Sequence, residues 1–344
     1  LSSGIDSSLI FTEIAKKNDN LNSYTIGFEG EESEIDSAIS LSKKFNVKNV
    51  NKVLKEDDVI ENLKIINNIY NEPLCDPSCI PMISLCKMAS KDVKVAISGD
   101  ASDEIFGGYN RYKLYNNILS ISELGSFILK NDFIKKLINN YIFQNNNLSK
   151  FTDNIINKQF SSAYEIIIKN NYRRNNLHVI NQDAKFKNDK ELNKLDKKLI
   201  PLFCDLNSYL PDNIFQKTDK ASMFYGLEVR TPFTNYELAN LGISHYKHCN
   251  YKNNKKPLLD LLKENYYEYE KRKIKKGFGI PKKFFSRKKI FDFLLQNIYG
   301  TKNLNEFVNN KFINKIILDY KIDPNKNFQK FFTLSNLSLW LKNQ

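Results

Sequence analysis

The sequence lacks several features that would place a protein in a familiar class. No apolar stretch approaches the length of a membrane span in its 344 residues. Its five cysteines form no Cys-X-X-Cys pair, and only three histidines are present. A chain this long can build a large core without disulfides, so we expect free thiols and a reducing compartment, the cytoplasm. Zinc binding by Cys75, Cys79 and Cys86 is an alternative, but no histidine lies near them in sequence.

Negative charge is also scarce. The 39 Asp and Glu residues face 52 Lys and Arg residues, which leaves a net charge of +13. Such an excess can attract polyanions. The lysines, however, are spread among asparagines and isoleucines, as in residues 145–150. We therefore attribute the charge to compositional bias and do not expect nucleic acid as a partner.

The first hundred or so residues alternate between helix and strand signals. No internal repeat and no Pro-rich or Gly-rich linker interrupts them. Alternation with short loops predicts an α/β fold in which helices cover a parallel sheet. The predicted helices are 7–17, 36–45, 59–70 and 80–90, and the predicted strands are 23–28, 47–53 and 93–97.

The pattern changes near residue 113. Segments 127–143, 160–171 and 255–269 carry apolar residues at three- and four-residue spacing, which is typical of amphipathic helices. No new strand is expected there. The sequence therefore predicts an α/β nucleotide-binding part over residues 1–112 and a mainly helical part over 113–344, which together complete one site.

Three acidic residues stand in segment 98–109 (SGDASDEIFGGY), directly after the predicted strand 93–97. They are Asp100, Asp103 and Glu104. Open α/β sheets bind their ligands at the carboxyl ends of strands. Carboxylates at such an edge commonly hold Mg²⁺ together with substrate phosphates. The alternative interpretation is a solvated acidic turn that caps the following helix.

The sequence opens on a short loop of small residues, LSSGIDSSL over 1–9. Backbone N–H groups around Gly4, followed by a helix amino end, favour phosphate binding. No Gly-Lys-Ser/Thr follows, so this is not a Walker A loop. Asp6 would repel bare phosphates, and a functional loop therefore implies a metal ion. Asp6 could instead stabilise the first turn of the helix.

Both segments resemble those of a known family. Segment 1–9 resembles the SGGxDS loop of the PP-loop ATP pyrophosphatases, with Ser3 in place of a glycine. Residues 209–223 (YLPDNIFQKTDKASM), 227–233 (LEVRTPF) and 275–281 (KKGFGIP) resemble, in the same order, stretches of the glutamine-hydrolysing asparagine synthetases. Residues 331–332 and 339–341, near the end of the sequence, also resemble that family. The resemblance covers nearly the whole chain and is weakest between about 119 and 199.

This resemblance implies a fold and an activity. The fold would be the adenine nucleotide alpha hydrolase-like (PP-loop) type, and the chain would be the synthetase domain, a carbon–nitrogen ligase. It would convert aspartate to asparagine through β-aspartyl-AMP, using ATP and Mg²⁺ and releasing AMP and pyrophosphate. Ammonia would come from glutamine through an N-terminal glutaminase domain of the same polypeptide, outside this sequence. Since the family loop normally follows a strand, we expect this sequence to be a fragment of a longer protein. A homodimer is a candidate assembly.

The resemblance also implies roles for individual residues. The expected pyrophosphate cradle is Ser2, Gly4, Asp6 and Ser7, with Ser98 and Gly99 close to phosphate. The expected metal ligands are Asp6 and Asp103. The expected catalytic residues are Lys275, on the α-phosphate, and Asp100, which would orient ammonia or accept its proton. The expected contacts to adenine and ribose are Leu1, Ile26 and Gly27, and Ser78 is the candidate for aspartate binding.

Several alternatives stay open from the sequence. Lys273 and Lys276 flank Lys275, so a shift of one position is an alternative, and a basic run is often only a solvated surface. Ala101 stands where the family usually has glycine. The roles of Asp219, Lys220, Glu228 and Arg230 stay open between site and scaffold. Rival functions are an amidotransferase of surface-polysaccharide synthesis, a β-lactam-forming synthetase, an RNA-modifying PP-loop enzyme and a non-catalytic binding module.

Overall fold

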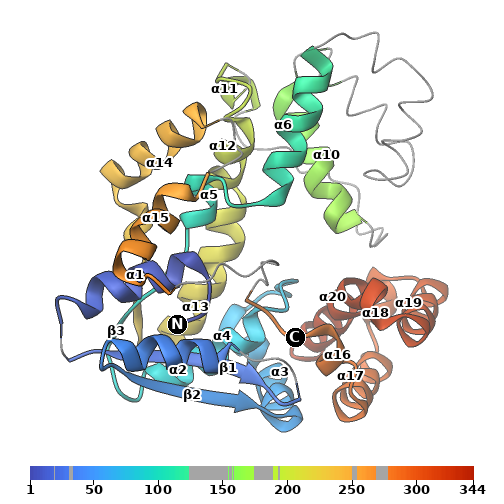
Figure 1. Ribbon diagram of the computed structural model, residues 1–344. Coiled ribbons are helices and arrows are strands. Elements are labelled where there is room, and N and C mark those ends of the chain that lie inside the picture. The colour runs from blue at the N-terminus through green and yellow to red at the C-terminus, as the bar shows by residue number, and fades with distance from the viewer. Residues whose placement is uncertain are drawn as a thin grey trace.

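The computed structural model of the chain is shown in Figure 1. It describes residues 1–18, 20–30, 34–123, 154, 157, 159–173, 189–192, 194–249, 254–268 and 278–344. The predicted helix 127–143 and the candidate Lys275 lie outside these residues. Across the described part, no helix combines the length and the hydropathy needed to cross a membrane. All five cysteines are free thiols.

The amino-terminal part alternates helices and strands, as predicted. Its elements are α1 (Ile5–Ala15), β1 (Asn22–Phe28), α2 (Ile35–Lys44), β2 (Lys48–Leu54), α3 (Glu56–Tyr70), α4 (Cys79–Ala89), β3 (Val95–Ile97) and α5 (Ser102–Phe106). Strands β1 and β2 are parallel, in a register that runs from Asn22 opposite Lys48 to Phe28 opposite Leu54. The predicted α/β class with parallel pairing is confirmed.

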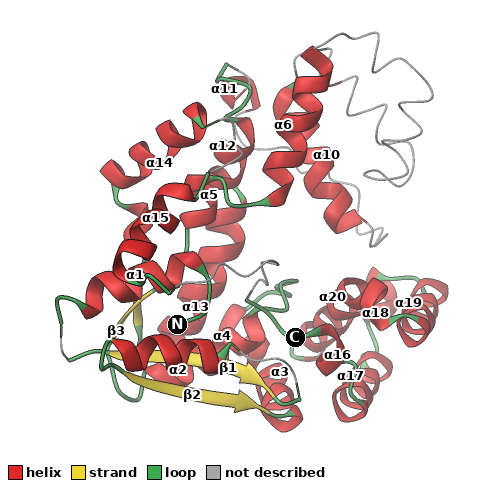
Figure 2. Cartoon of the chain, in the orientation of Figure 1, coloured by secondary structure: helices red, strands yellow, loops and turns green. Residues whose placement is uncertain are grey.

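The remaining part is mainly helical (Figure 2), also as predicted. Its described elements are α6 (Asn110–Glu123), α10 (Phe160–Arg173), α11 (Asp189–Leu192), α12 (Ile200–Asn207), a π-helical turn η1 (Leu210–Phe215), α13 (Gln216–Phe224), β4 (Glu228–Arg230), a 3₁₀ turn η2 (Pro232–Thr234), α14 (Tyr236–His248), α15 (Lys256–Asn265), α16 (Lys282–Phe285), α17 (Lys288–Gly300), α18 (Leu304–Phe307), α19 (Asn310–Ile322) and α20 (Pro324–Lys342).

Strand β4 contradicts the expectation that no strand follows residue 113. It pairs in parallel with β3, with Val95 opposite Glu228 and Ile97 opposite Arg230. A strand of three residues is too short to show a period-two pattern, so alternation along the sequence does not predict it. The pairing brings segment 227–233 to the end of β3, where the acidic segment begins. Glu228 and Arg230 also pair with each other on the surface, at 2.8 Å.

The largest part of the core lies between α3, α4 and the carboxyl-terminal helices. On α3 the buried side chains Val59, Leu63, Ile66 and Tyr70 recur every three or four residues and form one apolar face. The ring of Phe331 on α20 stacks on Tyr320 of α19, with centroids 4.1 Å apart. Complete burial of a side chain such as Phe331 stabilises the fold by about 1.5–3 kcal/mol.

Helix α20 also holds the loop between α3 and α4. Side-chain groups of Gln329, Asn336 and Trp340 donate hydrogen bonds to backbone carbonyls of that loop. The accepting residues are Cys75, Leu74 and Asn71. Helix α20 therefore fixes a loop about 260 residues earlier, with separations of 254 to 269 positions, and one of the three donors, Trp340, belongs to the closing residues that match the family.

Ala101 has a left-handed backbone, with φ at 71°. This conformation brings Cβ close to a carbonyl oxygen and costs about 1–2 kcal/mol for a residue other than glycine. The Ala101→Gly variant should therefore be more stable by about 1 kcal/mol, after allowance for the entropy of glycine in the unfolded chain. Denaturant titration measures the change. In the matched variant Ala38→Gly, inside α2, stability should fall by about 1 kcal/mol. Equal losses in both variants would contradict the strain at Ala101.

Candidate active site

The loop before α1 is closed by hydroxyl groups. The hydroxyls of Ser2 and Ser7 lie 2.7 Å apart, and the backbone N–H of Ser2 donates to Ser7 Oγ at 3.1 Å. Ser2 Oγ in turn accepts from the N–H of Gly4 at 3.1 Å. The loop therefore curls tightly at the amino end of an eleven-residue helix, which is the terminus that favours anions.

Leu1 lies beside the middle of β1. Its amino group donates to the carbonyl of Tyr24, and its carbonyl accepts from Thr25 Oγ1 at 2.9 Å. Ile26 and Gly27 follow directly along the same strand. The three residues expected near adenine and ribose thus lie close together along β1, and Leu1 leads directly into the serine loop.

The acidic segment lies against this loop. A Cβ atom added to Gly99 would come within 3.1 Å of both Asp6 Cβ and the backbone nitrogen of Ser7. The preceding Ser98 is fixed by its N–H, which donates to the carbonyl of Arg230 at 2.9 Å. Ser102 Oγ donates to Asp6 Oδ1 at 2.7 Å. Glycine at position 99 thus allows two segments nearly a hundred residues apart in sequence to touch.

Lys255, immediately before α15, joins the two predicted metal ligands. Its Nζ atom lies 2.7 Å from each carboxylate oxygen of Asp6 and 2.5 Å from Asp103 Oδ1. Burial by itself would lower the pKa of Lys255, but the charges of Asp6 and Asp103 outweigh it and raise that pKa. The ammonium group is therefore charged, and it forms ion pairs with both carboxylates.

The donor set at this point fits Mg²⁺. Asp6 and Asp103 offer hard oxygen atoms that already converge on a cationic group. Mg²⁺ commonly uses one or two protein carboxylates and takes its other ligands from water and substrate phosphates. The described residues contain no group of three or more His, Cys, Asp or Glu that could hold a metal by themselves. The arrangement thus suits a metal that arrives with a phosphate ligand, and it gives no support to a zinc site at Cys75, Cys79 and Cys86.

The absence of a side chain at Gly108 leaves room for the ion pair between Lys255 and Asp103. A Cβ atom at Gly108 would lie 1.8 Å from Asp103 Oδ1 and 2.6 Å from Lys255 Cε. The backbone after α5 must therefore pass directly over the ion pair, and only a residue without a side chain fits there.

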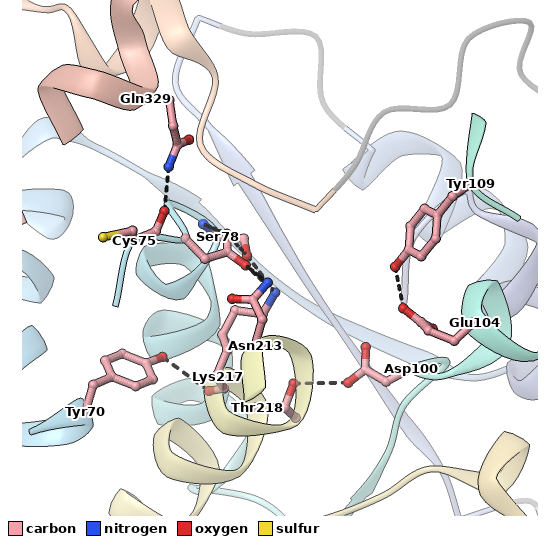
Figure 3. A network of polar contacts seen from close by, with 11 residues as sticks. Tyr70, Cys75, Ser78, Asp100, Glu104, Tyr109, Asn213, Lys217, Thr218 and Gln329 are labelled. Atoms are coloured by element: carbon pink, nitrogen blue, oxygen red, sulfur yellow. Dashed lines mark hydrogen bonds and ion pairs between the residues drawn. The ribbon is translucent and has the colours of Figure 1, made fainter. Parts of the chain in front are cut away.

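A second polar network extends from Asp100, as Figure 3 shows. Thr218 on α13 donates from Oγ1 to Asp100 Oδ2 at 3.0 Å. The preceding Lys217 donates from Nζ to Ser78 Oγ at 2.7 Å and to Asp76 Oδ2 at 3.1 Å. Asn213 Nδ2 reaches the same Asp76 oxygen at 3.2 Å. Segment 209–223 thus belongs to the site through Asn213, Lys217 and Thr218, whereas Lys220 pairs with Glu72 outside it.

Burial and the partner's charge shift the pKa values of Asp76 and Lys217 in opposite directions. Burial would raise the pKa of Asp76, but the ammonium of Lys217 and the hydrogen bonds from Ser78 lower it. Burial would lower the pKa of Lys217, and the charge of Asp76 raises it. Both groups are therefore ionised.

The glycine-rich loop that ends at Pro281 approaches this second network. A Cβ atom on Gly279 would lie 3.9 Å from Ser78 Cβ, which is ordinary contact distance. The described end of that loop therefore lies against the Asp76–Ser78 turn. Lys275 itself lies outside the described residues, so its place stays a prediction.

Glu104 is almost fully buried behind the site, where it is 1% exposed. Burial raises the pKa of its carboxyl group to about 7, although the hydroxyl of Tyr109 donates to it and partly opposes the rise. The guanidinium group of Arg111 lies 3.8 Å above the ring of Tyr109 and pairs with the buried Asp205 at 2.5 Å. These contacts anchor α5 and α6 to α12.

Sequence reasoning missed part of the site. Lys255 gave no distinct signal because it stands in a lysine-rich run, and Asp76 and Lys217 were considered only as parts of longer motifs. The sequence predicts the serine loop, the acidic segment and Ser78. The structure brings the first two into contact. Ser78 lies in the second network, which reaches the acidic segment through the neighbouring residues Lys217 and Thr218.

The parallel strand pairs and the mainly helical remainder are consistent with a domain of the PP-loop type. The family model described as "Asparagine synthase" matches residues 1–342. The chain belongs to the asparagine synthase family.

Named relatives agree with this assignment. The chain is 24% identical over 363 residues to "Asparagine synthetase [glutamine-hydrolyzing] 1" of Bacillus subtilis (strain 168), a match that covers 99% of the chain and 55% of that protein. It is 30% identical over 240 residues to "Putative asparagine synthetase [glutamine-hydrolyzing] 2" of Methanocaldococcus jannaschii, covering 65% of the chain and 44% of that protein. It is 38% identical over 114 residues to a "Putative asparagine synthetase [glutamine-hydrolyzing]" of Mycobacterium tuberculosis (strain ATCC 25618 / H37Rv), covering 33% and 18%. The chain thus spans about half of the length of the Bacillus subtilis protein and a smaller share of the other two proteins.

The raised pKa of Glu104 predicts a pH effect on stability. The folded protein keeps this proton up to about pH 7, whereas the unfolded chain loses it near its ordinary value of 4.5. The stabilising contribution is complete below pH 4.5 and is lost as the pH rises through about 7. The Glu104→Gln variant cannot ionise at this position. It should be about 1–3 kcal/mol more stable than the wild type at pH 8 and similar in stability at pH 4.5.

Urea titration at both pH values measures the free energy of unfolding. Glu61→Gln, on the exposed side of α3, is the control and should show the same difference from the wild type at both pH values. A Glu104→Gln difference that does not depend on pH would contradict the assignment.

Proposed function

We propose that the chain catalyses the ATP-dependent amidation of aspartate to asparagine through β-aspartyl-AMP, with release of AMP and pyrophosphate. The observation that carries the proposal is the convergence of Asp6 and Asp103 on Lys255 beside the serine loop. A carboxylate has no leaving group at neutral pH, so it must be activated before ammonia can attack it. The site offers groups for holding pyrophosphate and neutralising its charge.

In the first step, a carboxylate oxygen of the acceptor attacks the α-phosphorus of ATP, and pyrophosphate departs. The loop at Ser2, Gly4 and Ser7 holds phosphate oxygens through N–H groups and hydroxyls, with Ser98 and Gly99 beside it. Asp6 and Asp103 would hold Mg²⁺, which would neutralise charge on the phosphates. The ammonium groups of Lys255 and Lys275 stabilise negative charge that develops on the phosphates in the transition state.

In the second step, ammonia attacks the acyl carbon, AMP departs and one proton must be removed. Asp100 would orient ammonia or accept this proton, and the hydrogen bond from Thr218 to one of its oxygens supports this role. Fixing a base by a neighbouring hydrogen bond keeps it within reach of the reacting atom.

The wider assignments belong to the same proposal. Residues 1–112 supply the nucleotide-binding part and residues 113–344 complete the site with Lys255, Lys217 and Lys275. An N-terminal glutaminase domain of the same polypeptide supplies ammonia from glutamine, the whole enzyme works in the cytoplasm, and a homodimer is its candidate assembly. Three rival functions would contradict the proposal: amidation of another acceptor, internal lactam formation and modification of RNA.

Product analysis tests the proposal. With ATP, aspartate and ammonium ions, the reaction should yield AMP and pyrophosphate in equal amounts with asparagine, because the loop lacks the lysine of a Walker A motif. Chromatography of the nucleotides and amino acids measures all three. ADP as the main product, or AMP formed only with an RNA substrate, would contradict the proposal.

Removing one charge from the metal site should slow adenylation. Asp6→Asn and Asp103→Asn should each lower the rate of pyrophosphate release roughly a hundredfold and raise the Mg²⁺ concentration needed for half-maximal rate. Folding should survive, because Lys255 keeps one carboxylate partner in either variant. Asp292→Asn, which opens an exposed ion pair on α17, is the matched control. Unchanged turnover at limiting Mg²⁺ in either site variant would remove that residue from the ligand set.

Lys275 should act mainly in the transition state. Lys275→Ala should reduce acyl-adenylate formation about a hundredfold to a thousandfold while the affinity for ATP stays nearly unchanged. Lys276→Ala is the neighbouring control and should have little effect. Pyrophosphate release and nucleotide binding are measured in both variants. If Lys276→Ala is the impaired variant, the assignment within this loop is shifted by one residue.

A further inference from the structure

The carboxyl-terminal helices form a recess that the proposed reaction does not use. Residues of α17, α18 and α19 line a space of about 380 Å³, part of which is open to solvent. These helices lie on the opposite side of the molecule from α1 and the loop before it, as Figure 1 shows. The recess therefore lies outside the candidate active site.

The floor of the recess is buried and apolar. Ile298, Leu304 and Ile313 line it, and each of them is 5% exposed or less. The polar residue beside them is Thr301, whose hydroxyl donates to the carbonyl of Asn297 at 2.8 Å. Because this hydroxyl is already satisfied, the floor offers a ligand an apolar surface.

The rim of the recess carries three amide groups. Asn305 lies on α18, and Asn310 and Asn314 lie one turn apart on α19. All three residues are exposed, and their side chains have no hydrogen-bond partner among the described residues. Tyr299, at the end of α17, completes the rim and is 67% exposed. Each amide thus has a donor and an acceptor for a molecule that enters the recess.

No charged side chain lines the recess, although the sequence has 52 Lys and Arg residues and 39 Asp and Glu residues. A charged ligand would lose water there without gaining an ion-pair partner, which is costly. Amino acids, nucleotides and metal ions are therefore poor ligands for this recess. It suits an uncharged molecule that has one apolar face and several hydrogen-bonding groups at its edge.

We propose that the recess binds a neutral monosaccharide unit. A sugar ring has an apolar face of C–H groups, which would lie on the floor and against the ring of Tyr299. Its hydroxyl groups both donate and accept, so adjacent hydroxyls would pair with the donor and the acceptor of the rim amides. A free sugar and the terminal unit of a glycan share this chemistry. The inference does not depend on the proposed function.

Saturation-transfer difference NMR with the full chain tests the inference, because it detects weak binding of small molecules. The probes are the methyl glycosides of glucose, galactose, mannose and N-acetylglucosamine. At least one of them should bind with a Kd on the order of 1–10 mM, since few hydrogen bonds offset the cost of association. The 6-phosphate and the protonated 2-amino form of the same sugar should bind at least about tenfold more weakly, because each carries a charge.

The free sugar is compared with its methyl glycoside to distinguish the two sources of the ligand. Equal binding of both would indicate the terminal unit of a glycan. Binding of the free sugar with loss of binding in the glycoside would indicate a free monosaccharide. Either result supports the inference.

Variants of the rim locate the bound sugar. Asn310→Leu and Asn314→Leu keep the size of the side chain but remove its hydrogen-bonding groups, so each should weaken binding about three- to tenfold. Tyr299→Ala should weaken binding by a similar factor. The matched control is Asn240→Leu, because Asn240 is also an exposed asparagine on a helix, α14, which lies away from the recess in Figure 1. This control should bind the sugar as the wild type does.

The inference is overturned if none of the free sugars or glycosides binds at concentrations of about 50 mM. It is also overturned if all three rim variants bind as tightly as the wild type, since the sugar would then lie elsewhere. Tighter binding of the 6-phosphate would contradict it as well, because lysines outside the recess would then hold the ligand. Adenylation of aspartate should be unchanged in the rim variants, so these outcomes do not bear on the proposed function.

Discussion

The site depends on one ionic contact, the ammonium group of Lys255 between Asp6 and Asp103. These three residues come from the first helix, from the segment after β3 and from the residue before α15. Their opposite charges hold together parts of the chain that are up to 249 positions apart. Because Gly99 and Gly108 lack side chains, the backbone can approach the contact closely on both sides. The two carboxylates are the proposed metal ligands and lie beside the serine loop, so this interaction would serve both folding and the proposed chemistry.

A second set of contacts surrounds Asp76 and Asp100. Helix α20 fixes the loop 71–75 through three side-chain hydrogen bonds, and this loop leads into Asp76 and Ser78. Helix α13 brings Lys217 to Asp76 and Thr218 to Asp100. The helical part of the chain therefore does more than cover the strands. It supplies the ammonium group that meets Asp76 and the hydroxyl group that meets Asp100 in the acidic segment.

Much of this could be predicted from the sequence, because alternating strand and helix patterns are local. Every strand and helix expected before residue 113 is present within a few residues of its predicted bounds. The three-residue strand β4 was missed because it is too short for a pattern. Lys255 was missed because many other lysines surround it in a sequence with 52 Lys and Arg residues. Partners such as Asp76 and Lys217 are set by tertiary packing, and neither side chain alone indicates that the other is near. The left-handed backbone of Ala101 follows from the close approach of its segment to α1, which no local propensity indicates.

The central claim is that the acceptor carboxylate attacks the α-phosphorus of ATP at this site. Labelling the side-chain carboxylate of aspartate with ¹⁸O tests it most directly, because the attacking oxygen must leave with AMP when ammonia displaces it. Mass spectrometry of the products of the full chain with ATP, ammonium ions and labelled aspartate should find one ¹⁸O atom in AMP and none in pyrophosphate. Label in pyrophosphate or inorganic phosphate, or AMP without label, would contradict an acyl-adenylate.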